Sequence, residues 1–272
     1  MLKGLDAVIL NYNDSIRVSL ASKKLLDLDL FENIVVVDNN SKPEQYNILK
    51  NTLDKDCILL QSKNNNGYAS GINNGLRYLE DKGCRVVLTL NPDMEITRKG
   101  IIDCYSFLLK HSDIAACSTQ MKAKGKTVSN YYDLPSLKTS MLNWIYSTIN
   151  PCFSKKQYDG YFTAGYIRES AAFYNYGHFK EIGFYDETFF LYEEGPSSAQ
   201  AFKRLGYKEA IVTDGEYSVH NHIGKTMNRY LFSLFRKSRF HYLEKYCGCN
   251  RFQIFLVNLV LANIFMPRRK SR

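Results

Sequence analysis

Four short apolar runs in the first ninety residues constrain the fold more than any other feature of the sequence. They are Ala7–Leu10, Ile34–Val37, Cys57–Leu60 and Val86–Leu90. Tyr68–Leu79 lies between the last two and repeats its apolar residues at helical spacing. Strands that alternate with helices predict an α/β fold with a mostly parallel central sheet, flanking helices and right-handed crossovers. A helix at about Thr97–Leu109 and a strand at Ile114–Cys117 extend the same pattern.

Polar residues follow three of these runs, at the point where each predicted strand ends. The segments are Asn11-Tyr12-Asn13, Asp38-Asn39-Asn40-Ser41 and Asn64-Asn65-Asn66-Gly67. In open α/β sheets, ligands bind at the carboxyl ends of the strands, so we expect a polar ligand-binding crevice at this edge. The sequence contains no Gly-x-Gly-x-x-Gly or Walker A motif, which argues against a dinucleotide site or a P-loop phosphate site.

The fourth run ends in Asn91-Pro92-Asp93. A proline cannot donate a hydrogen bond to the sheet, so Pro92 ends the strand and leaves Asp93 in the loop at its carboxyl end. A carboxylate at this place suits a divalent cation that carries phosphate oxygens, because Mg²⁺ and Mn²⁺ prefer oxygen ligands. From these three residues alone, an ordinary turn is the alternative interpretation.

Composition and charge narrow the class of protein. The 272 residues are 45% hydrophobic and 23% charged, enough for one α/β domain with a small extension. Seven cysteines without a secretory signal indicate reduced thiols in a cytoplasmic protein.

Residues 221–272 hold 11 of the 36 basic residues and one of the 27 acidic residues, a formal charge of +10, whereas the rest carries −1. A basic tail on a nearly neutral body indicates an anionic surface met at one end and argues against nucleic-acid binding.

Four motifs occur in a characteristic order and spacing. They are Asn11-Tyr12-Asn13, Val35–Ser41, Asn65-x-Gly67-Tyr68-Ala69-x-Gly71 and Asn91-Pro92-Asp93. Together they resemble the inverting, GT-A-fold glycosyltransferases of family 2, and within them the rhamnosyltransferase-like enzymes of bacterial surface polysaccharide synthesis. The resemblance covers about residues 5–225 and implies a nucleoside-diphosphate sugar donor with Mg²⁺ or Mn²⁺. It implies that Asp38 contacts the base or ribose and that Asp93 binds the metal, with Asn91 where a first acid often stands. The other implied donor-site residues are Asn11, Asn13, Asn40, Asn65, Gly67, Tyr68 and Gly71.

A later segment also resembles the family, in which an acidic pair carries the catalytic base. It reads Phe189-Phe190-Leu191-Tyr192-Glu193-Glu194-Gly195-Pro196. The commoner Glu-Asp version of the motif would place its aspartate at Gly195 and a later acid at Ser197. Pro196 suits the first position of a helix with Gly195 as its cap. On an extended segment only one of the two glutamates would point into the crevice. We predict Glu194 as the base, kept ionised by the positive end of that helix, with Glu193 as the alternative. An ordinary acidic helix start remains the other interpretation.

Two further segments have open interpretations. His220 and His222 share a face of an extended segment and could bind a metal, and the resemblance places a histidine here near the donor phosphates or the metal. A surface histidine pair is the alternative. The segment at about Lys122–Asp159 lacks clear periodicity, and we expect it to form acceptor-side loops and short helices.

The C-terminal segment is basic and aromatic and then strongly apolar. As a helix, Phe252–Met266 would be about 22 Å long, short of a bilayer core of ~30 Å, so a membrane-spanning role is disfavoured. A helix in the interface of an anionic membrane, flanked by Arg251 and residues 268–272, is one interpretation. Burial against the catalytic domain is the other.

The resemblance therefore implies an inverting hexosyltransferase that uses dTDP-rhamnose or a UDP-hexose. The expected acceptor is a hydroxyl of a growing, lipid-linked surface glycan, and the expected location is the cytoplasm or the inner face of the cell membrane. Residues 1–226 would form the GT-A domain, with 1–117 binding the nucleotide sugar and 118–226 carrying the acceptor side and the base, followed by a helical extension at 227–272.

One rival is a nucleotidyltransferase, but Asn11-Tyr12-Asn13 does not supply the expected glycine-rich loop. The other is a non-catalytic donor-binding, membrane-docking protein, consistent with Gly195 and Ser197 where acids often occur.

Overall fold

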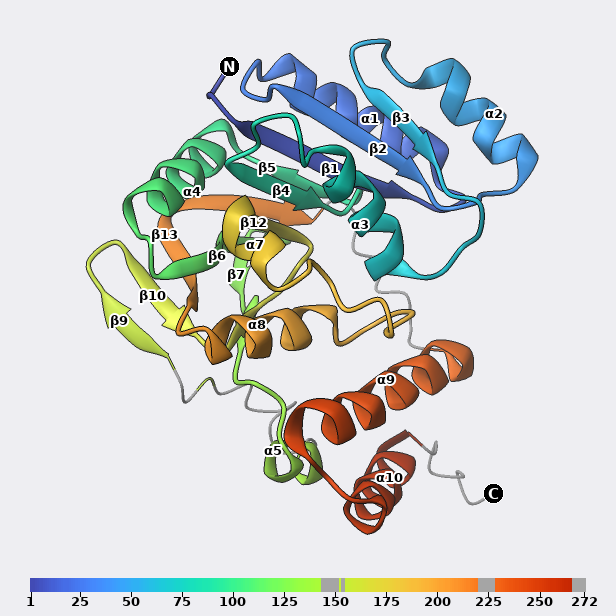
Figure 1. Ribbon diagram of the computed structural model, residues 1–272, viewed down its shortest axis with the longest axis vertical. Coiled ribbons are helices and arrows are strands. Elements are labelled where there is room, and N and C mark those ends of the chain that lie inside the picture. The colour runs from blue at the N-terminus through green and yellow to red at the C-terminus, as the bar shows by residue number, and fades with distance from the viewer. Residues whose placement is uncertain (143–151, 153–154, 220–227, 266–272) are drawn as a thin grey trace.

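The computed structural model describes residues 1–142, 152, 155–219 and 228–265, with side chains up to residue 261 (Figure 1). The elements of the first half are β1 (Leu5–Asn11), α1 (Ser15–Asp27), β2 (Asn33–Asp38), α2 (Pro43–Thr52), β3 (Ile58–Gln61), α3 (Tyr68–Tyr78), β4 (Val86–Leu90), β5 (Met94–Ile96) and α4 (Arg98–Lys110). The predicted strands and helices of this half are confirmed to within one or two residues at their ends.

The second half contains more and shorter strands. Its elements are β6 (Ile114–Ala123), β7 (Lys126–Val128), β8 (Tyr131–Tyr132), α5 (Leu137–Met141), β9 (Lys156–Tyr158), β10 (Tyr161–Ala164), β11 (Tyr166–Ile167), β12 (Ala171–Asn175), α7 (Tyr176–Glu181), α8 (Glu194–Arg204), β13 (Lys208–Val219), α9 (Arg229–Cys247) and α10 (Arg251–Phe265). The expected loops and short helices at 122–159 are only partly confirmed: the described part of that segment contains loops and the short helix α5, but also the strands β7, β8 and β9. Trp144 lies outside the described residues.

The central sheet is parallel on one side and mixed on the other. Its strand order is β3-β2-β1-β4-β12-β6-β13-β10-β9, with β5 paired to β13 and β7 paired to β6. Strands β3, β2, β1 and β4 are parallel neighbours, as predicted. Strand β12 then lies antiparallel between β4 and β6, whereas β6 and β13 are parallel. Apolar periodicity does not report strand direction, which is why the sequence did not reveal these antiparallel insertions.

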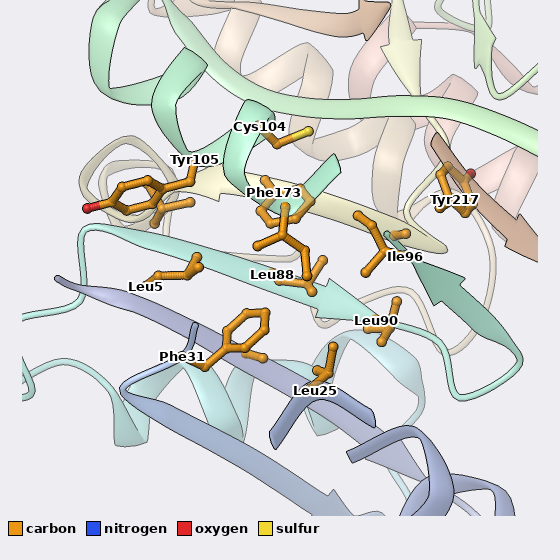
Figure 2. Packing of buried hydrophobic residues seen from close by; sticks show 14 of the residues in the cluster. Leu5, Leu25, Phe31, Leu88, Leu90, Ile96, Cys104, Tyr105, Phe173 and Tyr217 are labelled. Carbon is orange, nitrogen blue, oxygen red and sulfur yellow. The ribbon is translucent and has the colours of Figure 1, made fainter. Parts of the chain in front are cut away.

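Both faces of the sheet are covered by helices. Because side chains alternate along a strand, Ile9 of β1 belongs to a buried cluster with residues of α1 and α4 on one face, and Val8 belongs to a cluster with residues of α3, α7 and α8 on the other. Figure 2 shows the first layer, in which Leu88 of β4 and Phe173 of β12 belong to one continuous cluster. A sheet buried on both faces fixes the positions of the strand ends, where the polar segments lie.

Helices α9 and α10 pack at one end of the body, beside α5 and the segment that precedes α8 (Figure 1). Their buried cluster contains Phe189, Tyr242, Leu243, Cys249, Val257 and Leu261. Burial of the C-terminal segment against the catalytic domain, one of the two interpretations, is therefore confirmed. Helix α10 nevertheless leaves Phe252, Phe255 and Leu259 exposed by 67%, 53% and 46%. No helix within the described residues has both the length and the apolar content to span a membrane.

Candidate active site

The carboxyl ends of β1 and β2 carry a hydrogen-bonded network. Asn11 lies opposite Asp38, and its Nδ2 donates to Asp38 Oδ1 at 2.7 Å. The Ser41 N–H donates to Asp38 Oδ2 at 3.1 Å, and Ser41 Oγ accepts from Asn11 Nδ2 and the Asn13 N–H at 3.1 and 2.9 Å. Asn11 and Asp38 are fully buried, whereas Asn40 is exposed in a left-handed turn with φ of +59°. Asp38 thus fixes the two loops relative to each other, and its contact with the nucleoside stays a prediction.

The loop before α3 joins β2 to the segment that leads to the acidic pair. Asn39 Nδ2 donates to Asn65 Oδ1 at 2.9 Å and to the Gly67 carbonyl at 3.0 Å. Gly67 has φ of +99°, and a Cβ there would lie 2.2 Å from the Phe190 carbonyl oxygen, so only glycine fits. The Tyr68 N–H donates to that same oxygen at 2.8 Å. The predicted donor loop therefore lies directly against residue 190.

Helix α3 strengthens this connection further along. Asn73 Nδ2 donates to the Tyr185 carbonyl at 2.8 Å and to Glu187 Oε1 at 2.9 Å, and Asn73 Oδ1 accepts from the Tyr185 N–H at 3.1 Å. A Cβ on Gly71 would lie 2.4 Å from Leu10 Cδ1, so glycine at this position allows α3 to approach β1 closely. This packing explains Gly71 without a ligand, and its predicted donor contact stays a prediction.

Tyr68 links the two predicted functional segments. Its hydroxyl donates to Asn91 Oδ1 at 3.3 Å. Burial raises the pKa of Tyr68, and the negative charges of Glu169, Glu194 and Asp93 raise it further. The turn that carries the predicted metal-binding acid and the segment that carries the predicted base therefore share one electrostatic environment around this side chain.

Asp93 is partly exposed in the turn between β4 and β5. Among the described residues, none forms a hydrogen bond or ion pair with its carboxylate, and no group of three or more His, Cys, Asp or Glu side chains is arranged to hold a metal. A single carboxylate fits Mg²⁺ or Mn²⁺ that takes its other ligands from a diphosphate and water. His220 and His222 lie outside the described residues; β13 ends at Val219, which pairs with Met94, the neighbour of Asp93.

Glu193 forms a buried ion pair with the C-terminal extension. Its Oε1 accepts from Arg239 Nε of α9 at 2.8 Å, and the two side chains are only 2% and 12% exposed. Burial raises the pKa of Glu193, although the adjacent guanidinium opposes this.

The predicted helix start is wrong: α8 begins at Glu194, and its N-cap is Glu193 in a left-handed conformation with φ of +70°, not Gly195. A proline is tolerated throughout the first helical turn because its missing N–H has no partner there, so Pro196 did not mark the first position.

Glu194 is the first residue of α8 and is 4% exposed. Its Oε1 is buried and has no hydrogen-bond partner among the described residues. Burial raises the pKa of Glu194 to about 8, and the charge of Glu193 adds to this, whereas backbone N–H groups of residues 192 and 194 oppose it. The expectation that the helix end keeps Glu194 ionised is therefore wrong, because desolvation outweighs the helix dipole. The argument from an extended segment does not apply, because Glu193 is left-handed and Glu194 is helical, and both glutamates are buried.

Two further side chains at the site, Glu169 and Arg239, were not predicted from the sequence. Glu169 precedes β12, and its neighbour Ser170 accepts a hydrogen bond at its carbonyl from the Asn91 N–H at 2.9 Å. The one sequence signal for Glu169 is that Gly195 stands where the commoner motif has an aspartate. A carboxylate from another segment could then take its place. The signal for Arg239 is weaker, since its basic segment also suits a lipid surface.

Comparisons with known proteins identify the family and the fold of the chain. Residues 6–180, from β1 into α7, match the model of glycosyl transferase family 2. The low-salt glycan biosynthesis hexosyltransferase Agl10 of Haloferax volcanii is 26% identical over 196 residues, which cover 71% of this chain and 60% of that relative. The chain thus spans less than two thirds of the length of this curated relative.

Two solved structures share the fold. The mannosyltransferase PcManGT from Pyrobaculum calidifontis, in complex with GDP-Man and Mn²⁺, has a TM-score of 0.61 and 12% identity, covering 97% of this chain and 75% of that one. GalNAc-T7 with UDP, GalNAc and Mn²⁺ has a TM-score of 0.59 and 14% identity, covering 89% of this chain and 50% of that one. The predicted GT-A-type α/β fold is confirmed by these likenesses. Because the family model matches more than half of the chain, the protein belongs to glycosyl transferase family 2.

Proposed function

We propose that the protein transfers a sugar from a nucleoside-diphosphate donor to a hydroxyl of a glycan, with inversion at the anomeric carbon. The observation that carries this proposal is the meeting, around Tyr68, of the Asp93 turn with the buried acids at the start of α8. Family membership supports the reaction class. The name of the hexosyltransferase relative supports a hexose donor and a glycan acceptor. Within that class we favour dTDP-rhamnose or a UDP-hexose, and a lipid-linked surface glycan as acceptor.

In this proposal the first half of the chain binds and orients the donor. Asp38 and the Asn65–Gly71 loop hold the nucleoside, and Asp93 holds Mg²⁺ or Mn²⁺ beside the diphosphate. When bound, the ion would offset the negative charge that develops on the departing diphosphate. The buried network around Asp38 keeps the loops in place before the donor arrives, so little ordering remains to be done on binding.

The second half supplies the proton acceptor. Glu194 takes the proton of the acceptor hydroxyl as that oxygen attacks the anomeric carbon from the face opposite the diphosphate. The bond from the anomeric carbon to the diphosphate oxygen breaks, and its electron pair leaves with the nucleoside diphosphate. Arg239 already binds one oxygen of Glu193, which favours Glu194 over Glu193 for this role. In its ionised form, a carboxylate with a raised pKa binds a proton more tightly than an ordinary one, which suits a general base.

A panel of sugar nucleotides tests this proposal. Thermal stabilisation by dTDP-rhamnose, UDP-hexoses and GDP-mannose, each with and without Mn²⁺, identifies the donor, because a ligand that binds only the folded state raises its melting temperature. Release of free nucleoside diphosphate from the stabilising donor then measures turnover. Stabilisation with release supports a glycosyltransferase. Stabilisation without release, with glycan acceptors present, supports the non-catalytic donor-binding alternative.

We also propose that α10 rests on an anionic lipid surface. Phe252, Phe255 and Leu259 are exposed and are spaced to share one face of the helix, beside the exposed Arg251. The formal charge of +10 on residues 221–272 suits anionic headgroups.

The double variant F252S/F255S should lose salt-sensitive sedimentation with phosphatidylglycerol vesicles. The control L205S, which changes an exposed apolar residue on the body, should keep it. Equal sedimentation with neutral vesicles, or preferential binding to duplex DNA, would contradict a lipid role.

A further inference from the structure

Gly195 stands where the commoner acidic motif carries an aspartate, and the space beside it is occupied. A Cβ on Gly195 would lie 2.9 Å from Cδ of Glu169 and 3.1 Å from its Cγ and Oε1. The backbone of Gly195 is in the ordinary helical region, so no left-handed conformation requires glycine there. The carboxyl of Glu169 therefore fills the volume that a side chain at position 195 would need.

The position of Glu169 connects both sides of the site. Its neighbour Ser170 binds the Asn91 N–H, which belongs to the turn that ends at Asp93. The Gly195 N–H, in the first turn of α8, donates to the Glu169 carboxyl. The exposed N–H groups at a helix start favour a negative charge. Glu169 Oε1 is buried and has no hydrogen-bond partner among the described residues, so one acceptor atom is left for a bound ligand.

The groups around Glu169 are mostly acidic or aromatic. Burial raises the pKa of Glu169 well above its ordinary value, and the charge of Glu194 is the next largest cause. The other titratable groups that act on this carboxyl or are acted on by it are Glu193, Glu209, Tyr68, Tyr174 and Tyr185. Because each carboxylate disfavours the charge on the other, Glu169 and Glu194 titrate as a coupled pair, in which ionising one carboxyl opposes ionisation of the other.

We propose that Glu169 replaces the acid missing at position 195 and forms, with Glu194, the catalytic base of the transfer. This inference rests on the proposed function. The transfer requires that one of the two carboxyls is ionised. The acceptor O–H bond breaks, its proton passes to the ionised carboxylate, and the oxygen bonds to the anomeric carbon as the nucleoside diphosphate leaves with the electron pair of the broken C–O bond. The pair has then gained one proton, which it returns to the solvent before the next turnover.

The first test replaces the carboxylate without changing its size. E169Q should lower release of nucleoside diphosphate by about 100-fold or more, the usual contribution of a general base. Thermal stabilisation by UDP with Mn²⁺ should stay at the wild-type level, because the proposed role of Glu169 is to accept a proton and not to bind the donor. Loss of both turnover and UDP stabilisation, or wild-type turnover in E169Q, would overturn the proposal.

The second test moves the acid from one position to the other. E169A should lose turnover, and G195D alone should also lose it, because the added side chain collides with the Glu169 carboxyl. The double variant E169A/G195D should recover turnover by about tenfold or more over E169A. The matched control E169A/G195N fills the same space without an acid and should recover nothing.

The outcomes separate this inference from the proposed function. A wild-type protein that turns over no donor overturns the proposed function and, with it, the role of Glu169. An active wild type in which aspartate and asparagine at position 195 restore turnover equally overturns the role of Glu169 alone. Recovery with aspartate only supports the assignment, because a purely structural role of Glu169 would be restored by either side chain.

Discussion

The buried carboxylates of the donor side and the acid side of the site differ in how they are paired, although Asn39 Oδ1 on the donor side also has no hydrogen-bond partner among the described residues. On the donor side, both oxygens of the buried Asp38 accept hydrogen bonds, from Asn11 and from the Ser41 backbone. On the acid side, each of three glutamates has one buried oxygen without a hydrogen-bond partner among the described residues. These atoms are Glu169 Oε1, Glu193 Oε2 and Glu194 Oε1.

In the proposed function, this difference separates the donor-binding side from the proton-accepting side. Paired polar groups keep the donor loops rigid, and rigidity lowers the cost of ordering on binding. Unpaired buried carboxylates destabilise the folded state, and proteins retain such groups mainly where they do chemistry. The buried carboxylates of the acid side therefore have a high proton affinity and lower the stability of the fold, whereas the hydrogen bonds of the donor side keep its loops in a fixed arrangement. Substitutions on one side, on the other, or at the junction between them should therefore have different effects.

The largest effect should come from removing both unpaired carboxylates at once. E169Q/E194Q should lower turnover by about 10²–10⁴-fold, because no proton acceptor is left, while the Kd for UDP with Mn²⁺ stays within twofold of wild type. Release of nucleoside diphosphate and calorimetric titration measure the two quantities. The control E44Q removes an exposed acid on α2 and should change neither. Loss of UDP binding in the double variant would abolish the distinction between the two sides.

The next effect concerns the ion pair through which the C-terminal extension supports the acid side. R239Q leaves Glu193 buried without its cation, which should cost about 3 kcal/mol or more and lower Tm by roughly 6 °C or more. Calorimetric unfolding measures this loss. K237Q, an exposed change on the same helix, should leave Tm nearly unchanged. The double variant E193Q/R239Q should recover part of the loss, since no charge stays buried. A wild-type Tm for R239Q would mean that α9 does not stabilise the acid side.

The junction between the two sides depends on Gly67. G67A should cost about 1–3 kcal/mol more than G83A and should weaken UDP binding. Both glycines have positive φ, of +99° and +75°, but a Cβ at Gly83 would meet nothing within 4 Å, whereas one at Gly67 would meet the Phe190 carbonyl. The pair of variants therefore separates backbone strain from collision. Equal losses in urea-induced unfolding would show that residue 67 does not hold the donor loop against the acidic segment.

The smallest effect is a pH dependence of stability. Glu194 has a pKa raised from 4.5 to about 8 on folding, so the folded state holds its proton more tightly than the unfolded state does. The resulting stability is fully present below pH 4.5 and is lost as the pH rises through about 8. E194Q, which cannot ionise, should therefore gain Tm relative to wild type between pH 5.5 and pH 8.5, by about 2 °C or more. A Tm of E194Q below that of wild type in this pH range would show that the helix end lowers the pKa of Glu194 more than burial raises it.

Much of the donor side was predicted from sequence because its signals are local. The run Val86–Leu90 and the proline after it define a strand and a turn within eight residues, and β4 and the Asp93 turn are where this pattern places them. The acid side depends on contacts between distant segments. Glu193 binds Arg239 across 46 residues, and Glu169 fills the space beside Gly195 from a different loop. Burial depends on such contacts, so the direction in which it shifts the pKa of Glu194 could not be read from neighbouring residues alone.

The most direct test of the account is a calorimetric titration of UDP, with and without Mn²⁺, into the wild type, D93A and E194Q, beside the turnover of each. Both variants should lose turnover. D93A should lose the tightening of UDP binding that Mn²⁺ gives, whereas E194Q should keep it at the wild-type level. Full tightening in D93A, or full turnover in E194Q, would contradict the division of the site into a metal-and-donor side and a proton-accepting side.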